Sequence, residues 1–245
     1  MKTITFPETD VLYDHAAARF EALAGEAVRE RGRFVVALSG GSTPIPLYER
    51  LACSESIEWE TVHAFWSDER CVPPASPESN YGAARRALLE RVSIPFENVH
   101  RIEGEREPIE AADAYEVLVR RELSEGGRFD LVLLGIGADG HTASLFPRHQ
   151  ALTETVRWIL PVHVSAEPAW RITMTLPLIN AARHVILLAV GSSKVEAVAQ
   201  MGGSDDPPAA RIAPDAGGPL VLIDAEAGRL LDARGRFTSG SSIRR

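Results

Sequence analysis

The sequence predicts an α/β fold in which a mostly parallel sheet carries helices on both of its faces. Short apolar runs alternate along the chain with longer segments whose apolar residues recur at helical spacing. This order of elements is typical of parallel sheets. Several runs, such as Phe34–Leu38, are apolar throughout, which is expected of a strand that is buried on both faces.

The first half of the chain contains five predicted elements. Its first element is a helix with an apolar face made by Leu12, Ala16, Phe20, Leu23 and Ala27. A strand at Phe34–Leu38 comes next, and Thr43 and Pro44 then have the residue types of an N-cap and N1 position. We expect the helix that begins there to end near Cys53. A strand at Val62–Trp66 and a helix capped by Ser79 follow.

The second half contains a helical pattern over Pro108–Leu123 and five apolar runs typical of strands. Those runs are Phe129–Leu134, Val156–Val162, Arg171–Thr175, Val185–Val190 and Leu220–Ile223. Helices are expected to begin near Thr175 and Gly191. Residues 202–219 are rich in Gly and Pro and predict a lid or an edge connection. No internal linker is evident, so we expect one domain over residues 1–238 and a frayed tail over residues 239–245.

Composition excludes several classes of protein. The 245 residues are 45% hydrophobic and 24% charged, which is typical of a globular chain and not of a disordered, collagen-like or coiled-coil protein. The net charge is -8 and no basic stripe is present, so we expect no nucleic-acid partner. No signal-peptide or membrane-spanning run is apparent, and two cysteines form no disulfide framework. We therefore expect a cytoplasmic protein without a membrane partner.

The loop after the first apolar strand has the residues of a phosphate-binding turn. Gly40 and Gly41 allow the backbone to approach a ligand closely, and Ser42 and Thr43 supply hydroxyl groups. The following helix would present free N–H groups to an anion. The alternative is an ordinary strand-to-helix turn. The loop is not a Walker A motif, because no Gly-Lys-Ser or Gly-Lys-Thr follows.

A second polar loop follows Trp66 and contains three charged residues in succession, Asp68, Glu69 and Arg70. Asp68 has the chemistry of a base or of a residue that orients one. Arg70 can hold a phosphate or polarise a carbonyl group. The alternative is a solvated turn, and the sequence alone leaves open which of the three would contact a substrate.

The third loop, residues 135–147, contains glycines, Asp139 and His141 directly after a well-formed apolar strand. The glycines fit the pattern GxGxxG, but Pro147 comes too early for the long helix of a dinucleotide site, and the next predicted strand does not end in an acid. His141 instead has the setting of a general base, because a histidine titrates near neutral pH. Asp139 is close enough in sequence to orient it or to bind substrate.

Two further cations, Arg171 and Lys194, lie near the start of a predicted strand or helix. Each alone is typical of a solvated surface, but together with the Gly40–Thr43 loop they would form a site for a dianion. The chain has no GxSxG elbow, no HExxH motif and no Cys/His cluster in sequence, so neither a serine esterase nor a zinc site is expected. His63 and His184 lie in or beside predicted strands and are interpreted as structural.

These loops together resemble the motifs of the 6-phosphogluconolactonase family. The motifs are Leu38–Pro44, Asp68–Pro73 with Ser79–Tyr81, and Leu134–Pro147, continued by Arg171–Thr175, Gly191–Lys194 and Pro208–Arg211. They occur in order between about residues 34 and 224. The resemblance implies a Rossmann-like fold similar to the glucosamine-6-phosphate deaminase and ribose-5-phosphate isomerase type. It also implies hydrolysis of 6-phospho-D-glucono-1,5-lactone, the second step of the oxidative pentose phosphate pathway, without a metal or an organic cofactor.

On this resemblance we expect catalytic roles for His141, Asp139 and Arg70. Gly40, Gly41, Ser42, Thr43, Asp68, Arg171 and Lys194 are the expected substrate- and phosphate-binding residues. The expected partner is a small sugar-phosphate lactone, and the sequence leaves open both a monomer and a small homo-oligomer.

Two alternatives remain at this stage. Glucosamine-6-phosphate deaminases share the Gly-Gly-Ser-Thr-Pro loop and the Asp-Gly-His, but after the His they carry a Phe-Asn-Glu-Pro run that supplies a carboxylate. Ser144–Pro147 has no carboxylate at that place, which favours the lactonase. A non-catalytic sugar-phosphate sensor would normally be joined to a basic DNA-binding module, and no such segment is seen.

Overall fold

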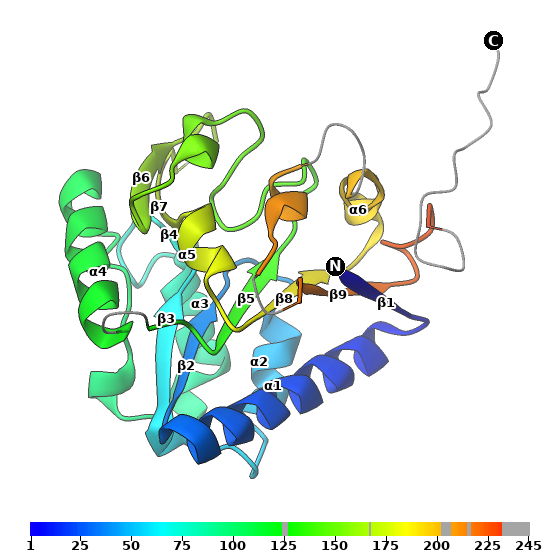
Figure 1. Ribbon diagram of the computed structural model, residues 1–245, viewed down its shortest axis with the longest axis horizontal. Coiled ribbons are helices and arrows are strands. Elements are labelled where there is room, and N and C mark those ends of the chain that lie inside the picture. Colours follow the sequence, from blue (N-terminus) through cyan, green and yellow to red (C-terminus); the bar gives the residue numbers. More distant parts are fainter. Residues whose placement is uncertain (124–126, 167, 202–206, 215–216, 232–245) are drawn as a thin grey trace.

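The computed structural model describes residues 1–123, 127–166, 168–201, 207–214 and 217–231 (Figure 1). The predicted tail at residues 239–245, the expected end of the domain at residue 238 and parts of the 202–219 segment lie outside these residues. Predictions for them remain untested.

The core of the molecule is a six-stranded parallel sheet with the strand order β1-β9-β8-β5-β2-β3. The strands are β1 (Lys2–Phe6), β2 (Phe34–Leu38), β3 (Val62–Trp66), β5 (Leu131–Gly135), β8 (His184–Ala189) and β9 (Leu220–Asp224). Every residue of β2 is buried, which confirms the inference from its continuous apolar run. β1 was not predicted from the sequence: it is a partly exposed strand at the edge of the sheet, and it pairs with β9 from the far end of the chain.

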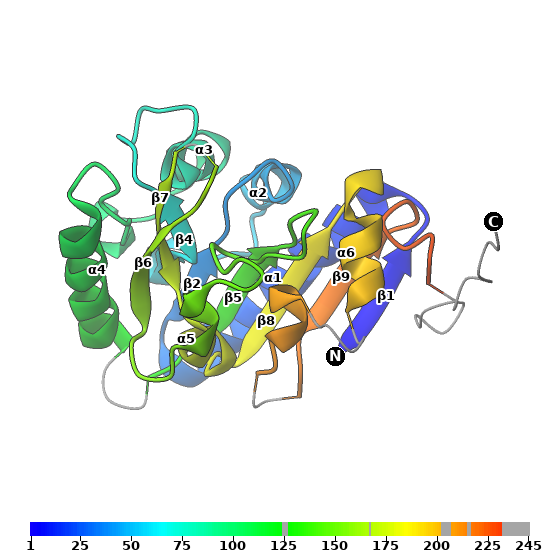
Figure 2. The same ribbon diagram turned by 90° about the horizontal axis from the view of Figure 1, so that it is seen from above.

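Helices cover both faces of this sheet. They are α1 (Thr9–Arg31), α2 (Ile45–Leu51), α3 (Asn80–Ala87), α4 (Pro108–Leu123), α5 (Leu176–Asn180) and α6 (Val195–Gln200). Short 3₁₀ turns are η1 (Trp59–Thr61), η2 (Leu89–Arg91), η3 (Phe96–Asn98), η4 (Gln150–Thr153), η5 (Ser192–Lys194) and η6 (Pro208–Arg211). α1 runs beneath the sheet, whereas α5 and α6 lie on the opposite face (Figures 1 and 2). The predicted arrangement of helices is confirmed.

A second, antiparallel sheet was not expected. It consists of β4 (Asp68–Arg70), β7 (Trp170–Met174) and β6 (Ile159–His163), in the order β4-β7-β6. Two predicted strands therefore belong to this sheet and not to the parallel one. The reason is the length of their connection: residues 164–169 are too few for the crossover that parallel neighbours require. The predicted loop at Asp68–Arg70 is the third strand.

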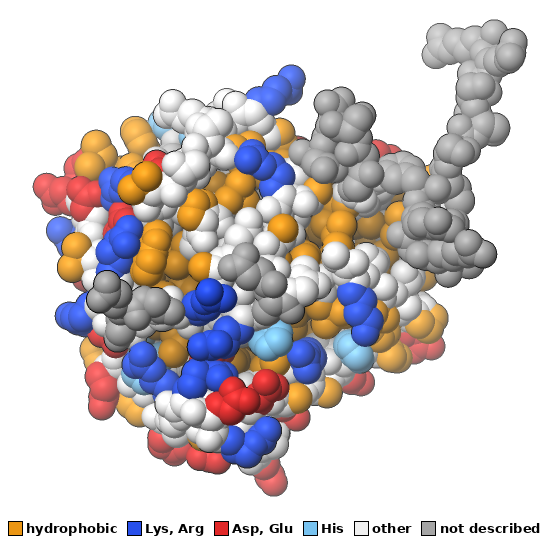
Figure 3. All heavy atoms as spheres, in the orientation of Figure 1, with side chains coloured by type: hydrophobic (Ala, Val, Ile, Leu, Met, Phe, Trp, Pro, Cys, Tyr) orange, Lys and Arg blue, Asp and Glu red, His pale blue; other side chains and the backbone are white. Residues whose placement is uncertain are grey.

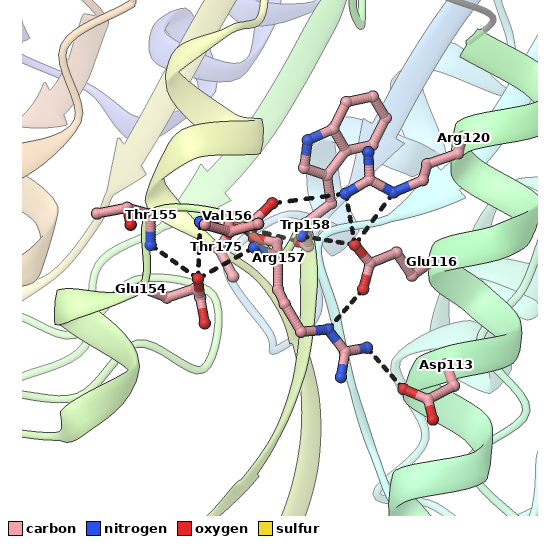
Figure 4. A network of polar contacts seen from close by, with 9 residues as sticks. All are labelled: Asp113, Glu116, Arg120, Glu154, Thr155, Val156, Arg157, Trp158 and Thr175. Atoms are coloured by element: carbon pink, nitrogen blue, oxygen red, sulfur yellow. Dashed lines mark hydrogen bonds and ion pairs between the residues drawn. The ribbon is translucent and has the colours of Figure 1, made fainter.

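The antiparallel sheet is attached to α4 by a polar network around one buried carboxylate (Figure 4). Glu116 accepts hydrogen bonds from the Trp158 backbone N–H at 3.0 Å and from the Arg157 guanidinium at 2.7 Å. The Arg120 guanidinium also donates to Glu116, and it lies 4.2 Å from the Trp158 ring centroid. These contacts hold β6 against the helix, so the second sheet has a fixed place beside the first.

Two predicted helix starts have different outcomes. The Ser79 hydroxyl accepts a hydrogen bond from the Gly82 N–H at 2.9 Å, so Ser79 is the predicted N-cap of α3. Thr43 is not an N-cap, because α2 begins at Ile45 and Pro44 occupies the cap position without a side-chain hydrogen bond. The Thr43 hydroxyl therefore does not cap α2.

Charged side chains of both signs are interspersed with apolar ones on the face that Figure 3 shows. Within the described ranges, none of the helices has both the length and the apolar character needed to cross a membrane. Cys53 and Cys71 are both free.

Candidate active site

A cavity of about 350 Å³ lies at the carboxyl ends of four neighbouring strands of the parallel sheet, β8, β5, β2 and β3. The chain passes from β2 to β3 on one side, while β5 lies on the other side of β2. Ligands of open α/β sheets bind where the strand order reverses in this way. The cavity is lined by residues from all three predicted loops and by Arg171 and Lys194.

The loop after β2 is held from two sides by tyrosine hydroxyls. Tyr48 of α2 donates to the Ser39 carbonyl at 2.7 Å and accepts from the Ser39 N–H at 3.0 Å. Tyr13 of α1 donates to the Thr43 carbonyl at 2.7 Å. A Cβ added at Gly40 would lie 1.8 Å from the Asn80 Oδ1 atom, so only glycine fits there. Ser42 and Thr43 line the cavity on a loop whose backbone is already fixed.

His141 and Asp139 form a pair on the loop after β5. The His141 Nδ1 atom lies 2.5 Å from Asp139 Oδ1, and the same oxygen accepts the His141 backbone N–H at 3.1 Å. Since Asp139 engages Nδ1, the Nε2 atom is the nitrogen that remains for a reacting molecule. The Phe146 ring packs against the imidazole with centroids 4.5 Å apart.

The Asp139 carboxylate contacts both the ring and the backbone of His141. Partial burial raises the pKa of Asp139, but hydrogen bonds and charge from His141 outweigh it and hold this pKa below its usual value. The carboxylate is therefore ionised near neutral pH and accepts from the imidazole. A Cβ at Gly137 would lie 2.1 Å from His141 Nδ1 and 2.8 Å from Asp139 Oδ1. The pair thus needs a glycine beneath it.

Asp68 connects the loop after β3 to the His141 loop. Its Oδ1 atom accepts from the Ser67 hydroxyl at 3.1 Å, and its Oδ2 atom accepts from the Ser144 hydroxyl at 2.7 Å. Ala143, beside Ser144, has a φ of 47°, a conformation that costs energy in a non-glycine residue and is often found at functional sites. The two loops therefore form one connected wall of the cavity.

Glu69 does not line the cavity; it supports α3 and the Arg70 backbone. Its buried carboxylate accepts from the Ser79 hydroxyl and from the backbone N–H groups of Arg70, Asn80 and Tyr81, at 2.7–3.0 Å. Burial raises the pKa of Glu69 in spite of these hydrogen bonds. The sequence left open which of Asp68, Glu69 and Arg70 would contact a substrate; of the three, Asp68 and Arg70 line the cavity, and Glu69 supports the structure behind it.

Two arginines lie side by side in the antiparallel sheet. Arg70 of β4 and Arg171 of β7 are directly opposite in the register, where like charges repel. Arg171 is 9% exposed and its Nε atom has no hydrogen-bond partner. Burial and then the charge of Arg70 lower the pKa of Arg171. Together with Lys194, which lines the same cavity, this arrangement is suited to a bound anion.

Nine of the ten predicted site residues line the cavity; Asp139 is the exception and acts on His141 from beside it. The sequence did not single out Ser39, Asn80 or Ser144 as site residues, although all three line the cavity. Ser144 stood within a recognised motif, but nothing local indicated its bond to Asp68. The segment after Gly140 contains no α-helix before β6, so the rejection of a dinucleotide site is consistent with the structure.

A comparison with models of protein families shows the family to which this chain belongs. The model of the family described as glucosamine-6-phosphate isomerases/6-phosphogluconolactonase matches residues 7–221. The chain belongs to this family. A 6-phosphogluconolactonase of Synechocystis sp. is 40% identical over 239 residues, which are 92% of this chain and 98% of that protein. A 6-phosphogluconolactonase of Mycobacterium tuberculosis is 39% identical over 82% of this chain and 86% of that protein.

Solved structures of this family have the same fold. The 6-phosphogluconolactonase of Trypanosoma cruzi matches with a TM-score of 0.83 at 31% identity, covering 95% of this chain and 97% of that chain. The 6-phosphogluconolactonase of Trypanosoma brucei matches with a TM-score of 0.82 at 28% identity, covering 94% of this chain and 98% of that chain. The fold class predicted from the sequence is confirmed.

Proposed function

We propose that this chain hydrolyses 6-phospho-D-glucono-1,5-lactone to 6-phosphogluconate. The observation that carries the proposal is the oriented His141–Asp139 pair at a cavity whose walls also hold Arg70, Arg171 and Lys194. A base and an anion site on one cavity suit a phosphorylated substrate with an electrophilic carbonyl. The relatives named 6-phosphogluconolactonase support the choice of substrate.

In the proposed reaction, His141 Nε2 takes a proton from a water molecule while the water oxygen attacks C1 of the lactone. The bond between C1 and the ring oxygen then breaks, and the imidazolium returns the proton to that oxygen. Asp139 stabilises the imidazolium in between. General base catalysis of this kind contributes about 10²–10⁴-fold to the rate.

The phosphate is assigned to Arg171, Lys194 and the hydroxyls of Ser42 and Thr43, which all line the cavity. Binding the phosphate away from the reacting carbon places C1 over His141. The N–H groups of Gly137 and Gly140 donate within their own loop, to the His141 and Gly137 carbonyls. We therefore assign the developing oxyanion to Arg70, whose guanidinium is tied on one side to the Glu78 carbonyl.

The proposal is tested by proton release from freshly prepared 6-phosphogluconolactone at neutral pH, with enzyme, without enzyme and with the His141→Ala variant. The control without enzyme is needed because this lactone opens spontaneously. We expect His141→Ala to lower kcat at least ~10²-fold with little change in KM. Activity within a few-fold of the wild type would exclude His141 as the base.

The same samples separate the lactonase from a deaminase. Among the cavity-lining residues that the structure describes, Asp68 is the one carboxylate, and it is already bonded to Ser67 and Ser144. Release of ammonia from glucosamine 6-phosphate without acceleration of lactone opening would overturn the proposed function. Binding of the sugar phosphate without turnover would indicate a sensor.

A further inference from the structure

A cluster of three potential metal ligands lies outside the cavity. His63 is at the amino end of β3, whereas the cavity is at the carboxyl ends of the strands. His100 follows η3, and Glu122 is in the last turn of α4. One ligand atom from each residue lies within 4.8 Å of the other two. Over the part of the chain that the structure describes, no other His, Cys, Asp and Glu side chains meet in such a group.

The fold holds His100 in place before any ligand arrives. Its backbone N–H donates to the Ala64 carbonyl at 2.8 Å, and Val99 forms a parallel bridge with the same residue. The Phe65 ring stacks on the His100 imidazole with centroids 4.3 Å apart. Since Ala64 and His63 are neighbours on β3, this pairing brings the two imidazoles together.

The distance between the two ring nitrogens fits a shared ion. His63 Nδ1 and His100 Nε2 are 3.2 Å apart. The two rings are nearly parallel with centroids 5.5 Å apart, so these nitrogens face each other. A Zn²⁺ ion with bonds of roughly 2.0–2.1 Å to both would lie about 1.3 Å to one side of the line between them, with an N–Zn–N angle of about 100°, and each ring would turn toward it on binding. The proton of the existing His–His hydrogen bond would move to the other nitrogen of its own ring, so the rings stay neutral.

Glu122 is the adjustable member of the cluster. Its side chain is 20% exposed and its carboxylate pairs with Arg121, which is 70% exposed. An ion pair this open to water is weak, so the carboxylate can exchange Arg121 for a cation at little cost. Arg33 lies beside Glu122, but its guanidinium donates to the Glu122 backbone carbonyl and not to the carboxylate.

We propose that His63, His100 and Glu122 form a binding site for a divalent transition-metal ion of the Zn²⁺ class, with water as the fourth ligand. Two imidazoles and one carboxylate are ligands that such ions accept. The ion would join β3, the segment after η3 and the end of α4. Its expected effect is to stabilise the native fold at this edge of the sheet, and the proposal does not depend on the reaction assigned to the cavity.

The test is titration of the chelator-treated full chain with ZnCl₂, followed by calorimetry and by the melting temperature. We expect one equivalent to bind, and we expect Tm to rise by roughly 5–10 °C at a free Zn²⁺ concentration of ~100 Kd. Glu122→Ala and His63→Gln should each weaken binding at least ~10-fold, because losing a ligand costs at least as much as losing an outer-shell partner of a ligand. Co²⁺ in place of Zn²⁺ gives a visible absorption signature of ligand geometry that should also be lost.

Two matched controls separate this site from other histidines. His184→Gln changes a half-buried histidine on β8, and His141→Gln removes the imidazole beside Asp139. Both should bind Zn²⁺ as the wild type does. The proposal is overturned if no equivalent binds, if Glu122→Ala and His63→Gln bind as tightly as the wild type, or if His141→Gln alone loses binding. If a histidine variant fails to fold, Glu122→Ala still tests the site. Glu122 is partly exposed on α4, so its replacement should leave the fold intact.

Discussion

The Ser144 hydroxyl donates a 2.7 Å hydrogen bond to Asp68 Oδ2 and so joins the His141 loop to β4, although the two residues are 76 positions apart in the sequence. Both residues are buried, and Ser144 lies three positions after His141. The Ser144 N–H also donates to the Thr173 hydroxyl at 3.1 Å, so the end of the His141 loop is fastened to both β4 and β7. This link fastens the His141 loop to the two strands that carry Arg70 and Arg171.

We therefore expect Ser144→Ala to lower kcat/KM about 10-fold and to lower the free energy of unfolding by about 1–2 kcal/mol, because Asp68 loses a buried donor. Steady-state lactone hydrolysis and urea denaturation measure the two effects. Ser56→Ala, at an exposed position, is the control and should change neither. An unchanged kcat/KM in Ser144→Ala would mean that the link does not position the site.

Gly137→Ala should reduce kcat without removing any catalytic group. The added methyl carbon would lie 2.1–2.2 Å from the His141 ring and displace it from Asp139. A misplaced base costs roughly 10²-fold in rate. The control is Gly135→Ala, at the end of β5, where a Cβ meets no atom within 4 Å. If both variants lose activity equally, displacement of the imidazole is not the cause.

Lys194→Ala should mainly raise KM, because Lys194 is assigned to the phosphate and not to the reacting carbon. Loss of one charged hydrogen bond predicts an increase of about 10-fold or more. Arg171→Ala should act in the same direction. The chain offers a close control in Lys2→Ala, the other lysine, at the amino end of β1. A loss confined to kcat would contradict the phosphate assignment.

Glu69→Ala should destabilise the fold strongly although Glu69 does not line the cavity. Four donors lose their acceptor in a buried place, which costs about 3–5 kcal/mol. Urea denaturation measures the loss, and Glu78→Ala, at an exposed neighbour, is the control.

The free energy of unfolding that Glu69→Ala loses should depend on pH. Because burial raises the pKa of Glu69, the native state holds this proton more tightly than the unfolded chain does. The stability of the wild type relative to Glu69→Ala is therefore largest below the unfolded pKa of about 4.3, and it decreases as pH rises toward the raised native pKa. A difference that grows over this range would contradict the assigned direction.

Much of the fold and most of the candidate site could be predicted from the sequence, because both depend on local pattern. Continuous apolar runs marked the buried parallel strands, and helical spacing marked α1 and α4. Parallel strands end at one edge of a sheet, so polar loops after them had to meet there. Gly40–Thr43, Arg70 and His141 were therefore expected at one cavity, and all of them line it.

Tertiary structure alone decided the contacts between residues far apart in the chain. No local pattern shows that β4 pairs with β7, which sets Arg70 against Arg171, or that Ser144 reaches Asp68. The sequence likewise lacked a clustered metal motif, yet folding brings His63, His100 and Glu122 within reach of one another. Period and residue type determine which elements form and which face is buried, whereas register and packing across long separations determine which side chains meet.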